Sequence, residues 1–467
     1  MSRKMKNKVL EGLEIERIAS EGKCVAHYEG KVVFVQHVAP GDVVDVRVTK
    51  GRSSYLEAEA INIRSYSKDR VEPFCQHFGV CGGCKWQHLD YSLQLSYKRQ
   101  QVIDQFQRIA KVPLPEVNPI IGAKEDRYYR NKLDFTFSNN RWLTQEEISS
   151  GETFEKNALG FHVPKRFDKI VDIAHCHLQE EPSNEIRNQL REFALSKGIS
   201  FYDIIRQEGT LRNLIIRTTL SGEVMVIVQF GEDNEETIQE VMAFLKDKFP
   251  NITSLLYIIN TKKNETFHDL EVHTYAGQPY IEEKMEGLRF RIGPKSFYQT
   301  NSAQAYRLYQ VAREYADLSG DQVVYDLYTG TGTIANFVAK QAKQVIGVEY
   351  VEEAVKDARI NSEVNGIENT VFYAGDMKDM FNEDFMKSHP APDVVITDPP
   401  RAGMHGDVVS RLNALGASKI VYVSCNPATQ ARDVALLSEI YEVKAIQPVD
   451  MFPQTYHVEN VVLLTKK

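Results

Sequence analysis

Cysteine 425 has the surroundings of a reactive thiol. It follows an apolar run, Ile420 to Val423, and precedes Asn426-Pro427. The run predicts a buried strand, and the Asn-Pro pair predicts a turn at its end. A free cysteine is more often a small core residue than a nucleophile. The position of Cys425 at a strand end nevertheless favours exposure and nucleophilic catalysis.

Two possible bases, His457 and Glu459, stand at the start of another apolar run, Val461 to Leu464. Either side chain could accept a proton near a thiol. That combination suits pyrimidine chemistry, because carbon 5 of uracil is a weak nucleophile until a thiolate adds at carbon 6. A base must then remove the carbon 5 proton so that the thiolate can leave.

These groups need a sheet to bring them together. From about Asp321 onward apolar strands alternate with helical segments, which predicts parallel β-α-β units. Four of the predicted strands end in polar or glycine-rich turns, at 328–333, Glu349, Asp376 and Asp398. Because the carboxyl ends of parallel strands share one edge, we expect one ligand edge there, with Cys425 beside Asp398.

The turn from Tyr328 to Thr333 indicates a nucleoside ligand. Its two glycines let the backbone approach a ligand closely, and Glu349 could accept hydrogen bonds from ribose hydroxyls. A tight turn with a surface glutamate is the alternative. Ala335 stands where a dinucleotide motif would have its third glycine, and Asp326 lies at the strand end. The pattern therefore favours S-adenosylmethionine over a nicotinamide dinucleotide.

Four cysteines could bind a metal. Cys75, Cys81 and Cys84 lie in one short segment, and Cys176 lies far along the chain. Gly82-Gly83 would let the segment wrap around a metal centre. Six cysteines without a recognisable secretory segment argue against a disulfide scaffold. The residues themselves leave zinc and iron-sulfur open.

The overall composition limits the classes of partner. No long apolar run is present, so we expect a soluble, cytoplasmic protein without a membrane partner, and no obligate protein partner is evident. The formal net charge of -8 means that RNA could be bound only through local cationic patches. The segment from Arg127 to Lys132 is a candidate, because aromatic residues alternate with cations there; a solvated surface is the alternative.

The 467 residues predict a multidomain α/β protein. Short alternating runs between about Val9 and Ile63 predict a small β-barrel, and a helix is expected from Tyr91 to Ala110. A strand-rich module follows, with a hairpin formed by 213–219 and 223–230. The expected division is a barrel at 1–65, a mixed α+β central domain with the cysteine cluster at 66–290, and a Rossmann-like domain at 291–467.

Five segments together resemble the RNA 5-methyluridine methyltransferases in order and spacing: Phe297 to Asn301, Asp326 to Gly332, Asp398 to Arg401, Ser424 to Pro427 and His457 to Glu459. The resemblance implies methylation of uracil carbon 5 in RNA, with Cys425 as nucleophile and Glu459 as the proton-abstracting base. It also implies that S-adenosylmethionine is surrounded by Gln299, Tyr328, Thr333, Glu349, Asp376 and Asp398. Tyr328-Thr329 stands where many members have Phe-Cys.

The first half of the chain resembles one branch of that family. Residues 74–88 are similar to the iron-sulfur loop of the 23S ribosomal RNA members, and residues 1–65 are similar to their TRAM domain, an oligonucleotide-fold barrel. The resemblance implies a structural 4Fe-4S cluster on Cys75, Cys81, Cys84 and Cys176, and 23S rRNA as substrate. Bacterial transfer RNA uracil-54 enzymes generally lack both features, although related cluster-bearing enzymes act on transfer RNA.

Two other functions are compatible with parts of the sequence. Asp398-Pro399-Pro400 resembles the motif of N-methyltransferases, but Arg401 replaces the aromatic residue that would stack on the target base. Such enzymes also have no use for Cys425 or Glu459. A non-catalytic RNA-binding factor could use the barrel and the cysteine cluster, but the complete set of polar strand ends argues against it.

Overall fold

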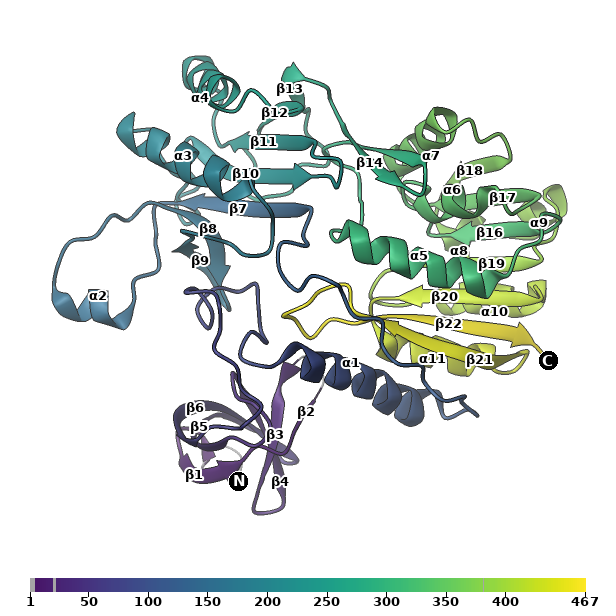
Figure 1. Cartoon of the computed structure of the whole chain (residues 1–467), viewed down its shortest axis with the longest axis horizontal. Coiled ribbons are helices and arrows are strands. Elements are labelled where there is room, and N and C mark those ends of the chain that lie inside the picture. The colour runs from purple at the N-terminus through teal and green to yellow at the C-terminus, as the bar shows by residue number, and fades with distance from the viewer. Residues whose placement is uncertain (1–4, 20–21, 381) are drawn as a thin grey trace.

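The computed structural model describes residues 5–19, 22–380 and 382–467. Its N-terminal part is a curved six-stranded sheet (Figure 1). Its order is β1-β5-β6-β4-β3-β2. The strands are β1 (Val9–Glu14), β2 (Arg17–Ile18), β3 (Cys24–Tyr28), β4 (Lys31–Gln36), β5 (Val43–Gly51) and β6 (Tyr55–Ser65). Val44, Val46 and Val48 of β5 all face the interior, as the two-residue period of a strand requires. The sheet corresponds to the predicted small barrel.

The middle of the chain forms a seven-stranded sheet of order β13-β12-β11-β10-β7-β8-β9. The strands are β7 (Lys132–Ser138), β8 (Ala158–Val163), β9 (Arg166–Asp172), β10 (Leu211–Thr218), β11 (Val224–Phe230), β12 (Ser254–Ile259) and β13 (His273–Gly277). Apolar side chains of helices α3 (Ser183–Ser196) and α4 (Glu235–Lys248) pack on it, and α2 (Gln145–Ser150) lies in an outer loop (Figure 1). β10 and β11 form the predicted antiparallel hairpin.

The C-terminal sheet is doubly wound, with order β18-β17-β16-β19-β20-β22-β21. The strands are β16 (Val323–Leu327), β17 (Gln344–Glu349), β18 (Thr370–Ala374), β19 (Val394–Thr397), β20 (Lys419–Ser424), β21 (Tyr441–Val449) and β22 (Glu459–Lys466). The first five are parallel, and β22 runs antiparallel to both β20 and β21. The predicted β-α-β units are therefore present, with a reversed strand inserted before the edge.

Helices cover both faces of this sheet (Figure 1). On one face lie α5 (Ser302–Ala316), α6 (Thr333–Ala339), α7 (Glu352–Val364) and the hairpin of β14 (Ile281–Met285) with β15 (Leu288–Ile292). On the other lie α8 (Met377–Met380), α9 (Glu383–Ser388), α10 (Gly406–Leu415) and α11 (Pro427–Leu437). The strands are apolar on both sides for that reason. Among the described residues, no helix is long and apolar enough to cross a membrane.

An early segment of the chain also belongs to this second face. Helix α1 (Tyr91–Gln105) and the π-helix η3 (Phe106–Ala110) pack against α11, and Val102 and Phe106 lie in the same core as the sheet. The Asp90 side chain begins α1 by accepting a hydrogen bond from the Ser92 amide at 2.9 Å. Residues 91–110 thus fold with the C-terminal sheet, although barrel and central strands lie on either side of them in sequence.

Candidate active site

The pairing of β20 with β22 brings the thiol and the acid together. The register sets Ser424 opposite Asn460, so Cys425, one residue beyond the strand, lies level with Glu459. Cys425 is half-buried, and Glu459 is only 5% exposed. Asn426 turns the chain into α11 by accepting a hydrogen bond from the Ala428 amide at 3.2 Å. Two groups that the sequence places 34 residues apart therefore meet at one sheet edge.

The turn after β19 adds an acid and a cation to this edge. The Asp398 amide donates to the Leu327 carbonyl at 3.3 Å, which links the ends of β19 and β16. The Arg401 carbonyl accepts from the Asn426 side chain at 2.9 Å and from the Thr429 hydroxyl at 3.1 Å. The turn is thereby held against the start of α11, and the positive charge of Arg401 acts on the Cys425 thiol.

Burial favours the protonated forms of all three titratable groups. It raises the pKa of Glu459 to about 8, an effect that nearby Asp398 increases and Arg401 opposes. It raises the pKa of Asp398 to about 7. Burial and the two acids raise the pKa of the Cys425 thiol to about 11, while Arg401 lowers it. In the free protein this edge therefore retains protons that solvated carboxylates would lose.

The turn after β16 has the geometry of a close approach to a ligand. Gly330 and Gly332 have φ values of 57° and 72°, and Tyr328 adopts the same left-handed region at 63°. A Cβ on Gly332 would lie 2.8 Å from that of Ala358, so this position requires glycine. The Glu349 carboxylate, at the end of β17, accepts from the Gly330 amide at 3.0 Å and braces the turn.

The loop before α5 lies beside this turn. The Thr331 hydroxyl donates to the Phe297 carbonyl at 3.3 Å and lies 3.3 Å from the Thr333 hydroxyl. Asn131, from the central sheet, donates its side-chain N–H to the Gln299 carbonyl at 2.8 Å. This loop therefore joins the central sheet to the glycine turn.

The six expected cofactor residues come from strand ends, from the start of α6 and from the loop before α5. Gln299, Tyr328, Thr333, Glu349 and Asp398 border the turns just described. Asp376 is exposed at the end of β18, where its carboxylate accepts from the Lys378 amide at 2.9 Å. Its charge still acts on the Tyr328 phenol, whose pKa is raised to about 12, chiefly by burial. The six residues thus lie along the same edge of the sheet and its neighbouring loops.

Sequence reasoning did not single out Tyr309 of α5. Its side chain is 4% exposed, and burial raises its pKa well above the ordinary value. Asp398, Asp326 and Glu459 add to that shift, so the phenol faces the acidic edge. A tyrosine within an amphipathic helix carries no signal that distinguishes it from an ordinary core residue.

The cysteine loop, which we define as residues 74–88, approaches Cys176. The Ala174 amide donates to His77 Nε2 at 3.1 Å, and the Gly83 amide donates to Cys81 Sγ at 3.4 Å. All four thiols are free, and the charges of Cys75, Cys81 and Cys176 act on Cys84. Within residues 5–19, 22–380 and 382–467, however, no group of three or more His, Cys, Asp or Glu is arranged to hold a metal ion.

Only part of the segment from Arg127 to Lys132 reaches the surface. Arg127 and Tyr128 are exposed, and the Arg127 guanidinium stacks 4.0 Å from the Phe74 ring centroid. The Tyr129 hydroxyl instead donates to the Pro453 carbonyl at 2.8 Å. Burial lowers the pKa of Lys132, which begins β7. The exposed positive surface is therefore smaller than the alternating sequence suggests.

The sheet order, the glycine turn after β16 and the acid after β17 define a Rossmann-like, S-adenosylmethionine-dependent methyltransferase. Comparison with known families agrees with this class. The model of the tRNA (Uracil-5-)-methyltransferase family matches residues 200–467, and that of the TRAM domain matches residues 3–61. The chain belongs to the tRNA (uracil-5-)-methyltransferase family.

Similarity to individual proteins extends along nearly the whole chain. An RNA methyltransferase of Bacteroides thetaiotaomicron is 57% identical over 451 residues, which are 96% of this chain and 99% of the relative. One of Porphyromonas gingivalis is 54% identical over 462 residues, 97% of this chain and 99% of the relative. The structure of Pyrococcus abyssi tRNA (uracil-54, C5)-methyltransferase with S-adenosyl-L-homocysteine has a TM-score of 0.75 at 30% identity, covering 98% of this chain and all of that one. The predicted fold and the prediction of an RNA uracil-C5 methyltransferase are confirmed.

The pKa of Glu459 predicts how stability depends on pH. Between the ordinary value of 4.5 and the native value of about 8, the unfolded chain loses a proton that the native protein retains. The free energy of unfolding should therefore fall with rising pH in the wild type, and Glu459→Gln should remove this contribution. The free energy of unfolding of Glu459→Gln, relative to that of the wild type, should rise by about 1 kcal/mol per pH unit. Urea unfolding at pH 5.5, 6.5 and 7.5 measures it.

Glu314→Gln, on the exposed face of α5, is the matched control, because its carboxyl group is solvated in both folded and unfolded chains. Its difference from the wild type should stay constant across the same pH range. An advantage of Glu459→Gln that stays constant or shrinks with pH would contradict the raised pKa.

Proposed function

We propose that the protein methylates carbon 5 of a uridine in 23S rRNA, through a covalent bond between Cys425 and carbon 6 of the uracil, with Glu459 as the base. The observation that carries this proposal is the strand register that sets Cys425 level with Glu459. A thiol and a carboxylate at one strand edge can act on adjacent atoms of a single ring. An N-methyltransferase would need neither group.

In the proposed reaction the Cys425 thiolate forms a bond to carbon 6, and the electron pair of the ring double bond moves toward carbon 5 and the carbonyl oxygen. Carbon 5 then takes the methyl group that S-adenosylmethionine supplies, which leaves S-adenosylhomocysteine. Glu459 accepts the carbon 5 proton, the ring double bond re-forms, and the bond to Cys425 breaks. The positive charge of Arg401 lowers the pKa of the thiol and so favours the thiolate at the first and last steps.

The charges of the site support activation only when the ligands are present. In the free protein the pKa of Cys425 is raised to about 11, so the thiolate is scarce at neutral pH. The sulfonium of S-adenosylmethionine would add a positive charge among Asp398, Glu459 and the thiol. A nearby cation lowers the pKa of each of these groups. Gln299, Tyr328, Thr333, Glu349, Asp376 and Asp398 are the residues that we assign to this ligand.

The TRAM domain and the family support RNA as the partner. The finer assignment to 23S rRNA rests on the resemblance of residues 74–88 to the ribosomal RNA members. Transfer RNA is the second candidate. It is favoured by the similarity of 98% of this chain to a tRNA (uracil-54, C5)-methyltransferase of known structure. Exposed Arg127 and Tyr128 could contact phosphate and base in either RNA.

We assign Cys75, Cys81, Cys84 and Cys176 as ligands of a 4Fe-4S cluster. The four thiols fit such a group, because their charges act on one another and the Gly83 amide donates to a sulfur. Bound there, the cluster would join the cysteine loop to the segment before α3.

The covalent mechanism can be tested with RNA that contains 5-fluorouridine, because fluorine cannot leave as a proton does. Wild-type protein should form an adduct that survives denaturing electrophoresis, and Cys425→Ala should form none and lose methylation. Glu459→Gln should accumulate methylated RNA bound to protein, with product release slowed about 10²- to 10⁴-fold. Cys24→Ala, which removes a buried thiol of the barrel, is the control and should stay active. Normal methylation by Cys425→Ala would refute the mechanism.

The substrate can be tested by mapping 5-methyluridine in cells with and without the protein. We expect a site in 23S rRNA to lose the modification and to regain it with wild-type protein but not with Cys425→Ala. Wild-type protein and Cys425→Ala differ only in the thiol, so comparing them distinguishes a role in methylation from a role in RNA binding alone. A loss confined to transfer RNA would replace 23S rRNA with the second candidate.

The cysteine assignment predicts metal content. Protein purified without oxygen should contain iron and acid-labile sulfide in equal amounts and absorb broadly in the visible range. Cys176→Ser should lose both, since it removes the ligand that closes the site, whereas Cys24→Ala should keep them. Stoichiometric zinc without iron in the anaerobic preparation would show a zinc site instead.

A further inference from the structure

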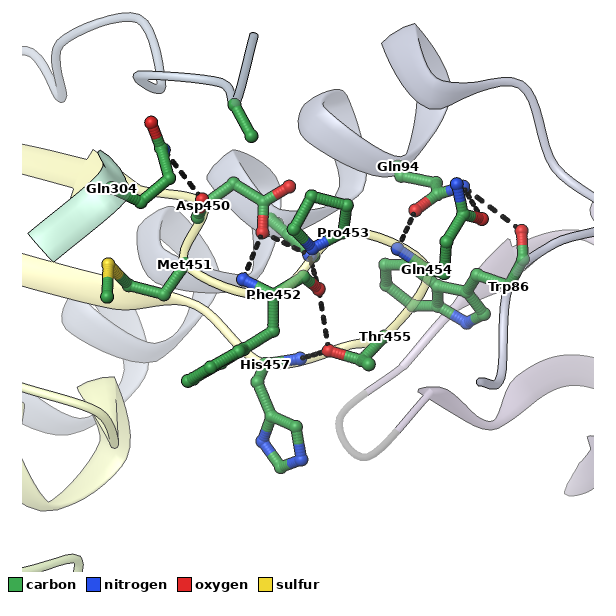
Figure 2. Close-up of polar contacts among 12 residues, drawn as sticks. Trp86, Gln94, Gln304, Asp450, Met451, Phe452, Pro453, Gln454, Thr455 and His457 are labelled. Carbon is green, nitrogen blue, oxygen red and sulfur yellow. Dashed lines mark hydrogen bonds and ion pairs between the residues drawn. The ribbon is translucent and has the colours of Figure 1, made fainter. Parts of the chain in front are cut away.

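The loop that leads to Glu459 is held mainly from outside itself. It joins β21 to β22 and covers Asp450 to Val458 (Figure 2). Inside the loop, the Phe452 amide donates to the Asp450 carboxylate at 3.0 Å, and the Thr455 hydroxyl donates to the Phe452 carbonyl at 2.8 Å. The Thr455 amide also donates to the Phe452 carbonyl, and the His457 amide donates to the Thr455 hydroxyl, both at 3.3 Å. The other hydrogen bonds described below come from residues elsewhere in the chain.

The first external anchor is a buried ion pair from α1. Lys98 Nζ donates to Asp450 Oδ1 at 2.6 Å and to the Phe452 carbonyl at 3.0 Å. The Tyr91 hydroxyl donates to the other carboxylate oxygen of Asp450 at 2.8 Å. The side chains of Lys98 and Asp450 have no solvent exposure, so neither charge has water as an alternative partner.

The second anchor is a pair of glutamines (Figure 2). Gln94 accepts from the Gln454 amide at 2.9 Å and donates to the Gln454 side-chain oxygen at 3.0 Å. The same Gln94 nitrogen donates to the Trp86 carbonyl at 3.1 Å. The amides of Lys85 and Trp86, in the cysteine loop, both donate to the Gln454 carbonyl, at 2.7 and 3.0 Å. The segment that directly follows Cys84 therefore binds the main-chain carbonyl of Gln454, while Gln94 of α1 binds its amide and its side chain.

Two further contacts come from the cofactor side. Gln304 of α5 donates to the Asp450 carbonyl at 2.7 Å (Figure 2), and Asn301 donates to the Met451 carbonyl at 3.0 Å. The loop thus lies between the start of α5 and the cysteine loop. Cys425 is held separately, by the turn into α11 and by the contacts of Arg401.

We propose that Gln94 and Lys98 are positioning residues for Glu459, and that Lys85 and Trp86 extend this positioning to the cysteine loop. They contact no reacting atom; they hold the loop whose end places the carboxylate beside Cys425. The inference rests on the proposed role of Glu459 as base. It requires that loosening the loop slows removal of the carbon 5 proton while thiol addition and methyl transfer continue, because Cys425 is held by other residues.

The test compares Gln94→Met with Gln100→Met. Gln94→Met removes all hydrogen bonds of the Gln94 side chain but keeps a side chain of similar length. Gln100→Met makes the same change on the exposed face of α1. Release of tritium from RNA carrying [5-³H]uridine reports proton removal, and the rate of adduct formation with 5-fluorouridine RNA reports the earlier steps. In Gln94→Met we expect tritium release to fall about 10- to 100-fold, with adduct formation within about twofold of the wild type.

Gln94→Glu keeps the acceptor for the Gln454 amide and should lie between Gln94→Met and the wild type. A purely structural effect would lower both rates together with the folded fraction, which thermal unfolding measures in the same samples. Equal losses in both assays, or no loss in either, would overturn the proposal. Glu459→Gln, assayed in parallel, tests the base itself. If this variant releases tritium normally, the assignment of the base fails. If it does not, but Gln94→Met does, only the positioning role fails.

Discussion

The buried ion pair between Lys98 and Asp450 is the interaction on which the arrangement of this protein most depends. Neither side chain is exposed, and their positions are 352 residues apart in the sequence. Burial lowers the pKa of the ammonium, and the facing carboxylate opposes that effect. Removing one partner from such a pair costs about 3–5 kcal/mol, because the other charge stays buried without compensation. Helix α1 therefore packs on the C-terminal sheet although central strands follow it in sequence.

The proposed catalytic edge depends on that arrangement and on the direction of strand β22. Because β22 runs opposite to its neighbours, its first residue lies at the edge where the parallel strands end. Glu459 thus lies near Cys425 and Asp398 in a partly buried place, and the pKa values of all three rise. Arg401 is the cation that opposes this shift. Without a ligand, the raised pKa of Cys425 keeps its thiol mostly protonated at neutral pH.

Local sequence signals predicted a large part of this structure. The strands at 323–327 and 394–397 are apolar and end in turn residues, and the hairpin of β10 with β11 has its Ser-Gly turn. Strand β21 was not predicted, since a proline and charged residues interrupt its apolar pattern. The partners of Lys98 and the environment of Tyr309 were also missed, because both depend on contacts between distant segments. The buried face of α1 is partly visible in the sequence, since Gln94, Lys98 and Val102 recur every four residues, but two of these residues are polar.

The place of β22 between β20 and β21 affects how the chain folds while it is being synthesised. Spatial order and order of synthesis differ here: residues 118–121 already bond to β21, but no other strand of the described sheet pairs with it until residues 459–466 exist. Until then the edge of β20, with Ile420 to Val423 fully buried in the finished protein, remains open. An unpaired apolar strand edge is a template for pairing with other chains. A nascent chain that stalls before Glu459, or one shortened there by a nonsense mutation, therefore combines an incomplete catalytic edge with a surface prone to aggregation.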